Sequence, residues 1–181
     1  MKRIEMKKYR HFIIILLIVV TLFLVDYFLF SLAIVKGESM FPTIKDGDRL
    51  IYIKSPCLYK DLKKGDIIIF HAPEKSRKAG LFIKRIIATE GESYYIEDGV
   101  LRINNMEIRE TYTCGGRYIN KDYPYIEGVV PKNRIFVLGD NRNNSNDSRR
   151  FSCVGKKEVE GKALIRIWPP DRINIFTNPH N

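Results

Sequence analysis

Histidine, cysteine and tryptophan are scarce in this chain of 181 residues, which holds 3 His, 3 Cys and 1 Trp. The cysteines are Cys57, Cys114 and Cys153, and they form neither a CxxC pair nor a Cys/His spacing typical of zinc sites. Three cysteines allow at most one disulfide, and the sequence does not identify its partners. Internal repeats and low-complexity tracts are also absent. With 45% hydrophobic residues, the composition indicates one globular domain and argues against disorder.

Acidic residues are fewer than basic ones, which gives a formal net charge of +10. Residues 1–11 hold five basic residues and one acidic residue, a net of +4, and the other charges are dispersed along the chain. Proteins that bind nucleic acid concentrate Lys and Arg in a patch, often with interleaved aromatic residues. The dispersed charge therefore argues against a nucleic-acid partner.

An apolar run over residues 12–35 follows the basic cluster and contains a single charge, Asp26. About 20 helical residues cross a bilayer core of roughly 30 Å, so the run predicts one transmembrane helix. The positive-inside rule then predicts a cytoplasmic N-terminus at residues 1–11 and an extracytoplasmic domain at 36–181. The alternative is a cleaved signal peptide, because residues 31–33 resemble a cleavage site, although the run is long for that class.

Short β-like runs bounded by turn residues follow the apolar run, and helical periodicity is hard to find there. The expected strands are residues 49–53, 67–70, 81–88, 94–96, 100–103, 134–138 and 163–168. Residues 156–160 suggest one helical turn, and residues 112–131 are expected to form an irregular loop or a small subdomain. The pattern predicts a mostly β fold.

Ser39 lies in a loop after the apolar run and is a candidate nucleophile as well as an ordinary turn residue. A serine hydroxyl reacts poorly until a base takes its proton, and that base is most often histidine. None of the three histidines is a strong candidate for this base. His11 precedes the apolar run, His180 is the penultimate residue, and His71 is expected to be a polar residue at the end of a strand.

Lys84 is a better candidate base because it lies inside an apolar strand. With the period of a β-strand it shares a face with Phe82 and Ile86. Burial lowers the pKa of a lysine, and a neutral amine can accept the proton of Ser39. The alternative is that Lys84 extends its ammonium group to solvent.

A polar segment, residues 139–149 with the sequence GDNRNNSNDSR, follows the expected strand 134–138. Ser145 could orient a base, and the charged side chains could form ion pairs. The candidates for those pairs are Arg85, Asp140, Arg142, Asp147 and Arg149. The alternatives are a surface turn whose ion pairs contribute little, or a calcium loop, although the ladder of carboxylates and the terminal Glu of such a loop are missing.

Three segments in this order resemble the type I signal peptidase family of bacterial membranes. Residues 37–43 (GESMFPT) resemble its nucleophile box, Lys84-Arg85 its base box, and residues 139–149 its C-terminal box. The resemblance covers about residues 8–170. It implies a signal-peptidase-like β catalytic core with a small variable inserted region at about residues 95–133, preceded by one N-terminal transmembrane helix.

The resemblance implies that Ser39 is the nucleophile and Lys84 the general base. The backbone N–H of Ser39 would help to stabilise the oxyanion. Ser145 would hydrogen-bond Lys84, and Met40 of the nucleophile box is a further supporting residue. Some family members carry a hydroxyl two residues before the nucleophile that joins the oxyanion hole. Gly37 stands there in this sequence, as in many Gram-positive-like members, so that donor is missing or supplied elsewhere.

Two ion pairs complete the expected site: Asp147 with Arg149, and Asp140 with Arg85. The implied activity is cleavage of signal peptides from exported preproteins after small residues at −1 and −3, with the peptide lying along a strand edge. The expected partners are preproteins, the lipid bilayer and the secretion machinery. We expect neither a cofactor nor a metal, because Ser–Lys chemistry needs none.

Two other functions stay open. One is a specialised Ser–Lys processing peptidase for pilus or conjugation proteins, which the sequence does not separate from a general signal peptidase. The other is a non-enzymatic, anchored basic domain that binds an anionic polymer, and the dispersed charge disfavours it.

Overall fold

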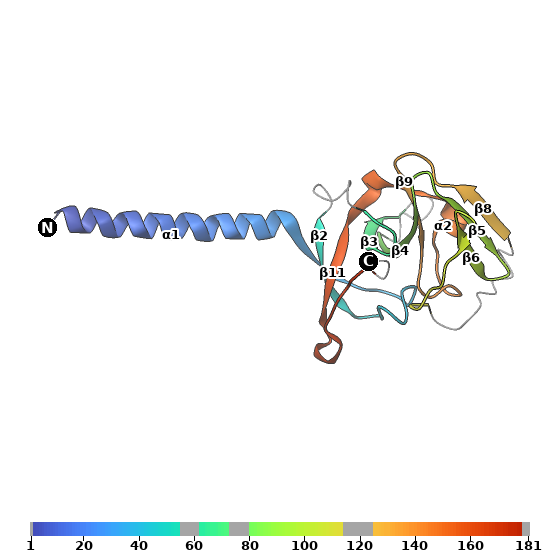
Figure 1. Cartoon of the computed structure of the whole chain (residues 1–181). Helices are drawn as coiled ribbons and strands as arrows, with labels where there is room; N and C mark the ends of the chain where they lie inside the picture. The colour runs from blue at the N-terminus through green and yellow to red at the C-terminus, as the bar shows by residue number, and fades with distance from the viewer. Residues whose placement is uncertain (1, 55–61, 73–79, 114–124, 179–181) are drawn as a thin grey trace.

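In the computed structural model, one long helix leads into a domain built mainly of antiparallel strands (Figure 1). The structure describes residues 2–54, 62–72, 80–113 and 125–178. Cys57, Cys114 and His180 lie outside the described residues. After the long helix, the described residues hold many strands and three short helices, α2 (Ser148–Phe151), η3 (Lys156–Glu158) and η4 (Pro170–Arg172). The prediction of a mostly β fold is therefore confirmed.

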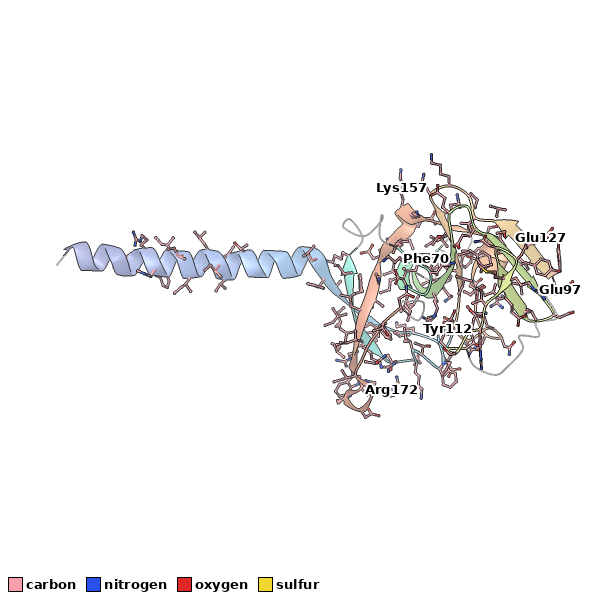
Figure 2. All side chains as sticks on the ribbon, in the orientation of Figure 1. Phe70, Glu97, Tyr112, Glu127, Lys157 and Arg172 are labelled. Atoms are coloured by element: carbon pink, nitrogen blue, oxygen red, sulfur yellow. The ribbon has the colours of Figure 1, made fainter. Side chains whose placement is uncertain are left out.

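Helix α1 (Lys2–Leu29) extends away from the β domain, and its side chains over residues 9–21 are exposed (Figure 2). The helix predicted for residues 12–35 ends earlier, because Phe30–Ile34 form strand β1. Strand β1 runs antiparallel to β2, with Leu32 opposite Ile51, so the backbone groups on that side of β1 are hydrogen-bonded within the sheet. Across the ranges that the structure describes, no helix is both long and apolar enough to cross a membrane.

The larger sheet follows the order β1-β2-β11-β3-β4-β9-β10, and β12 pairs with β11. All of these pairings are antiparallel. Besides β1, its strands are β2 (Arg49–Lys54), β3 (Ile67–His71), β4 (Leu81–Thr89), β9 (Arg134–Leu138), β10 (Val154–Gly155), β11 (Val159–Trp168) and β12 (Asn174–Ile175).

Strand β11 joins the two parts of this sheet. Its register shifts against both β2 and β3, and such irregularities bend a strand and increase its twist. At Gly161 an added Cβ would lie 2.4 Å from the carbonyl oxygen of Ile53, so only glycine allows this approach. The bent strand brings the loop between β1 and β2 into the same part of the molecule as β4.

A second sheet follows the order β7-β6-β5-β8. Its strands are β5 (Ser93–Glu97), β6 (Val100–Ile103), β7 (Met106–Glu107) and β8 (Tyr125–Val129). The sheet falls largely within the residues 95–133 that were expected to form the inserted region. Residues 112–131 were expected to form an irregular loop or a small subdomain, and strand β8 agrees with the second alternative: it pairs with β5, and Gly128 makes room there for the Tyr94 side chain.

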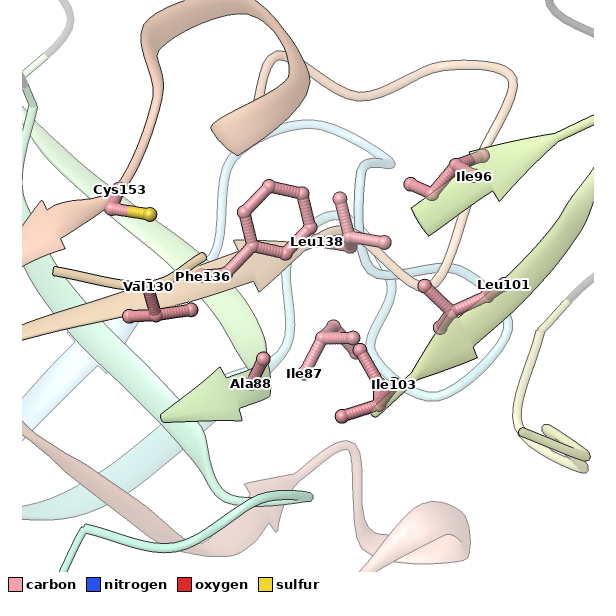
Figure 3. Close-up of a cluster of buried hydrophobic side chains, with 9 residues drawn as sticks. All are labelled: Ile87, Ala88, Ile96, Leu101, Ile103, Val130, Phe136, Leu138 and Cys153. Carbon is pink, nitrogen blue, oxygen red and sulfur yellow. The ribbon is translucent and has the colours of Figure 1, made fainter. Parts of the chain in front are cut away.

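The two sheets share a hydrophobic core (Figure 3). Strands β4 and β9 of the larger sheet and β5 and β6 of the smaller one contribute most of its side chains. Its members are Ile87, Ala88, Ile96, Leu101, Ile103, Val130, Phe136, Leu138 and Cys153. Tyr94 stacks on Phe136 with 4.1 Å between ring centroids, which adds an aromatic contact across the two sheets. This core fixes the smaller sheet against the strands that carry the candidate site.

Candidate active site

Ser39 lies in the turn that connects β1 to β2. The next residue, Met40, is 1% exposed and packs in a core cluster with Val35, Ile44 and Leu50. The backbone closes around it, because the Ile44 N–H donates to the Met40 carbonyl at 2.8 Å. Met40 thus anchors the turn in the core while the neighbouring Ser39 side chain stays partly exposed.

Lys84 lies on β4 and is 3% exposed, which excludes the alternative of an ammonium group extended into solvent. Its Nζ donates hydrogen bonds to Ser39 Oγ and to the Ile83 carbonyl, each at 2.8 Å. Burial lowers the pKa of Lys84 from 10.5 to about 8, the charges of Asp147 and Asp140 act in the opposite direction, and Arg149 lowers it slightly further. Roughly a tenth of the amine is then neutral at pH 7.

Gly139, at the end of β9, lies against the turn that holds the candidate nucleophile Ser39, which we call the nucleophile turn. An added Cβ would lie 2.4 Å from the Ser39 carbonyl oxygen and 2.3 Å from Ser145 Oγ, distances that no side chain tolerates. Two residues later, the Asn141 N–H donates to the same Ser39 carbonyl at 3.0 Å. The loop after β9 therefore holds the backbone of Ser39, the candidate nucleophile, directly.

Ser145 lies in this loop, but the hydrogen bond expected between Ser145 and Lys84 is absent. Among the described residues, the buried Ser145 Oγ has no hydrogen-bond partner. The Lys84 ammonium group donates to Ser39 Oγ and to the Ile83 carbonyl instead, and Ser145 Oγ lies against Gly139.

Asp147 organises the end of the same loop and is fully buried. Its carboxylate accepts from Arg149 Nε and Nη2, both at 2.7 Å, and from the Gly139 N–H at 3.0 Å. Asp147 is also the N-cap residue of α2. Through these contacts the Asp147–Arg149 pair fixes the two ends of the loop to each other.

Asp140 and Arg85 form a second ion pair, fully buried at the carboxylate. Arg85 Nε donates to Asp140 Oδ1 at 2.9 Å, and Nη2 donates to Oδ2 at 2.7 Å. The Thr43 hydroxyl donates to the same Oδ2 at 2.5 Å. This carboxylate therefore links β4, the loop after β9 and the nucleophile turn. Thr43 is in the nucleophile box, but its partner was not predicted.

The His71 side chain contacts a residue outside this arrangement. Its Nε2 contacts Glu160 Oε2 at 3.1 Å, and the His71 side chain is largely exposed while that of Glu160 is partly exposed. The sequence expectation of a polar residue at a strand end agrees with this position.

A cleft of about 730 Å³ opens beside Ser39 and Lys84. Strand β1 forms one of its walls and the start of β4 another, and the lining is mainly apolar. Its lining includes Leu32, Ile34, Met40, Leu81, Ile83 and Asn144. Because β1 is an edge strand of the larger sheet, one row of its backbone groups is available for pairing. The arrangement offers a nucleophile, a base and room for an extended chain.

Comparison with known proteins places these features in a family. The profile of the family described as "Signal peptidase, peptidase S26" matches residues 6–168. The chain is 36% identical over 150 residues to the "Signal peptidase I" of Leptolyngbya laminosa, covering 80% of this chain and 72% of that protein. It is 34% identical over 176 residues to the "Signal peptidase IB" of Staphylococcus aureus (strain MRSA252), covering 90% of each.

A crystal structure of a signal peptidase I from Enterococcus faecalis V583 is similar at 32% sequence identity, with a TM-score of 0.47, covering 56% of this chain and 96% of that one. The family resemblance drawn from the three sequence segments is confirmed by the profile and the two relatives. The chain belongs to the signal peptidase family, peptidase S26, and is a hydrolase of that family.

Proposed function

We propose that this protein is a membrane-bound serine endopeptidase that removes N-terminal signal peptides from exported preproteins, using Ser39 and Lys84 as a catalytic dyad. The observation that carries the proposal is the 2.8 Å separation between Lys84 Nζ and Ser39 Oγ at the edge of an apolar cleft. The lowered pKa of Lys84 supports it, because a buried amine is more easily deprotonated.

The reaction begins when the neutral Lys84 amine accepts the proton of Ser39 Oγ, and that oxygen attacks the scissile carbonyl carbon. The backbone N–H of Ser39 stabilises the negative oxygen of the tetrahedral intermediate. The Lys84 ammonium group then gives its proton to the leaving amine, and an acyl-enzyme ester remains on Ser39. In the second half, Lys84 takes a proton from a water molecule as that water attacks the ester carbonyl. The bond between the acyl carbon and Ser39 Oγ then breaks, the carboxylic acid product leaves, and the Lys84 ammonium group returns the proton to Ser39 Oγ.

Substrate recognition follows from the cleft and its edge strand. An extended peptide can pair with the backbone of β1, and its alternate side chains then point toward the apolar wall. Leu32 of β1 and Ile83 of β4 contribute apolar side chains to the two walls of the cleft. Small residues at −1 and −3 of the substrate fit such shallow spaces, and we propose them as the specificity of the enzyme.

The apolar part of α1, residues 12–29, is proposed to anchor the chain in the membrane, with residues 1–11 cytoplasmic and the β domain extracytoplasmic. In support, the side chains of α1 over residues 9–21 are exposed and mostly apolar. Preproteins emerging from the secretion machinery would meet the site at the same membrane face. Confinement to one surface raises the effective concentration of the substrate.

The test is cleavage of a purified preprotein by the full chain in detergent, followed by sequencing of the new N-terminus of the product. We expect cleavage after a small residue by the wild type and none by Ser39→Ala. Replacing the −1 Ala of the substrate by Phe should abolish cleavage. A Ser39→Ala variant that still cleaves would refute the proposed nucleophile, and cleavage restricted to one pilus-type substrate would favour the specialised processing function.

A further inference from the structure

A carboxylate outside the three motif segments reaches the loop that holds the nucleophile. Glu110 follows β7 of the smaller sheet, in the inserted region. Arg142 Nη1 donates to Glu110 Oε2 at 2.6 Å, and Nη2 donates to the second carboxylate oxygen. The two side chains are 9% and 8% exposed, so this bidentate pair is shielded from water. Such planar, two-bond pairing fixes orientation as well as distance.

Arg142 connects this ion pair to the backbone that lies against Ser39. Its Nε donates to the Gly139 carbonyl at 3.0 Å. Gly139 in turn lies against the Ser39 carbonyl, with no room for even a Cβ between them. A continuous chain of close contacts therefore runs from Glu110 through Arg142 and Gly139 to the backbone of Ser39.

Tyr112 forms a second connection, from the same segment to the other ion pair. Its hydroxyl donates to Glu110 Oε1 at 2.6 Å, and its ring centroid lies 4.0 Å from the Arg85 guanidinium carbon (Figure 2 labels Tyr112). Burial raises the pKa of Tyr112, and the charge of Glu110 raises it further, so the phenol stays protonated. The ring covers the guanidinium group that is paired with Asp140.

Removal of the Glu110 charge would leave a buried guanidinium without its counter-ion. A buried charge that loses its partner is strongly destabilised, and the usual response is a local rearrangement that admits water. The group that would have to move is Arg142, whose Nε holds the Gly139 carbonyl. A displacement of about 1 Å at a reacting centre can lower its rate by about 100-fold.

We propose that Glu110 and Tyr112 are positioning residues for the Ser39–Lys84 dyad, with Glu110 acting through Arg142 and Tyr112 through Arg85. This inference rests on the proposed function. It assigns a role in the reaction to the inserted region: the segment after β7 supplies the counter-ion and the aromatic cover that hold the loop after β9. Neither residue lines the cleft beside Ser39, so they act on the geometry of the dyad and leave peptide binding alone.

The experiment compares Glu110→Gln, Arg142→Gln and the double variant with the wild type, using the full chain in detergent. The matched control is Glu107→Gln, an exposed carboxylate on β7 of the same sheet. Two measurements are made: the kcat and KM for a signal-peptide substrate, and the amide hydrogen exchange of residues 139–147. The second measurement does not depend on activity.

For Glu110→Gln we expect kcat to fall by about 10- to 100-fold with KM changed by less than about twofold. Exchange should become faster at residues 139–141 and stay unchanged in β11. The double variant should lose little more than either single one, because both remove the same pair. Glu110→Asp, which keeps the charge, should recover part of kcat. The Glu107→Gln control should match the wild type in both measurements.

Unchanged exchange at residues 139–147 in Glu110→Gln would overturn the inference, whatever the activity. So would a change confined to KM. If the wild type cleaves no signal-peptide substrate but Glu110→Gln still exchanges faster at residues 139–141, the coupling is supported and the proposed function is refuted. If Glu110→Gln does not fold, Tyr112→Leu decides: faster exchange at residues 139–141 supports the inference, and wild-type exchange overturns it. Its control is Tyr125→Leu, on the exposed face of the same sheet.

Discussion

Lys84 Nζ lies 2.8 Å from Ser39 Oγ, although the two residues are 45 positions apart in the chain. The core residue Met40 fixes the serine, and strand β4 fixes the lysine, so two rigid elements set the distance. The loop after β9 then holds the Ser39 carbonyl from the other side through Asn141. The proposed chemistry depends on all three elements.

The pH dependence of cleavage should follow the lysine. Because burial lowers the pKa of Lys84 to about 8 and the base must be neutral, kcat/KM should rise with pH and level off above about 8. Below that pH it should fall tenfold per unit. A rate profile measured from pH 6 to 10 checks this. A rate that still rises tenfold per unit between pH 8 and 10, as for an ordinary lysine with a pKa of 10.5, would contradict it.

Lys84 should also lower the stability of the fold at neutral pH. Its folded-state pKa lies below its ordinary value of 10.5, so the unfolded chain binds more protons between pH 8 and 10.5, and the free energy of unfolding rises with pH in that window. Lys84→Met should therefore raise the free energy of unfolding at pH 7 by about 3 kcal/mol while removing activity. Urea titration measures this, with exposed Lys157→Met as the control. A Lys84→Met protein less stable than the wild type would count against the account.

Gly139→Ala should remove activity. Its Cβ would meet the Ser39 carbonyl oxygen at 2.4 Å, so the nucleophile turn has to move. We expect at least about a 100-fold loss of kcat/KM, with about 1–3 kcal/mol of lost stability from overpacking. Gly155→Ala is the control, since its Cβ would make only an ordinary contact at 3.6 Å. Wild-type kinetics in Gly139→Ala would show that the loop and the turn are not rigidly coupled.

Ser145→Ala and Ser148→Ala should differ in their effect on stability. Ser145 Oγ is buried with no hydrogen-bond partner among the described residues, and removing such a hydroxyl should raise the free energy of unfolding by about 1 kcal/mol. Ser148 Oγ accepts from the Val137 N–H at 3.0 Å, and its removal should lower that free energy by about 1–2 kcal/mol. Chemical denaturation of both variants checks the contrast. Equal losses would mean that Ser145 has a partner in solution.

Substitutions of Asp140 and of Glu160 should also change the free energy of unfolding by different amounts. Asp140→Asn breaks a fully buried ion pair with Arg85 and should lower the free energy of unfolding by about 3–5 kcal/mol. Glu160→Gln breaks only the exposed contact with His71 and should change it by less than about 0.5 kcal/mol. Thermal melts of the two variants, compared at one pH, measure the difference. A small loss in Asp140→Asn would contradict the support assigned to this pair.

Much of the fold and of the candidate site could be predicted from local sequence patterns. The apolar pattern around Lys84 predicted a buried strand, and β4 spans Leu81–Thr89. The polar run at 139–149 predicted a loop on a rigid strand, which β9 supplies. These predictions succeeded because strand period and turn chemistry are local properties.

Other features depend on tertiary contacts, and the sequence did not reveal them. Strand β1 lies inside a continuous apolar run, so its alternation of Phe30, Leu32 and Ile34 with smaller residues was hidden. Glu110 lies 32 residues from Arg142, and nothing in its neighbourhood marks it as a partner. Such pairs arise only when the two sheets pack together.

The most direct test of the Ser–Lys dyad is cleavage of a preprotein by the Lys84→Ala and His71→Ala variants beside the wild type. The structure places Lys84 Nζ on Ser39 Oγ and His71 on the exposed Glu160. We predict that Lys84→Ala loses activity while remaining folded and that His71→Ala cleaves at the wild-type rate. Full activity in Lys84→Ala, or its loss in His71→Ala, would contradict the assignment of Lys84 as the base.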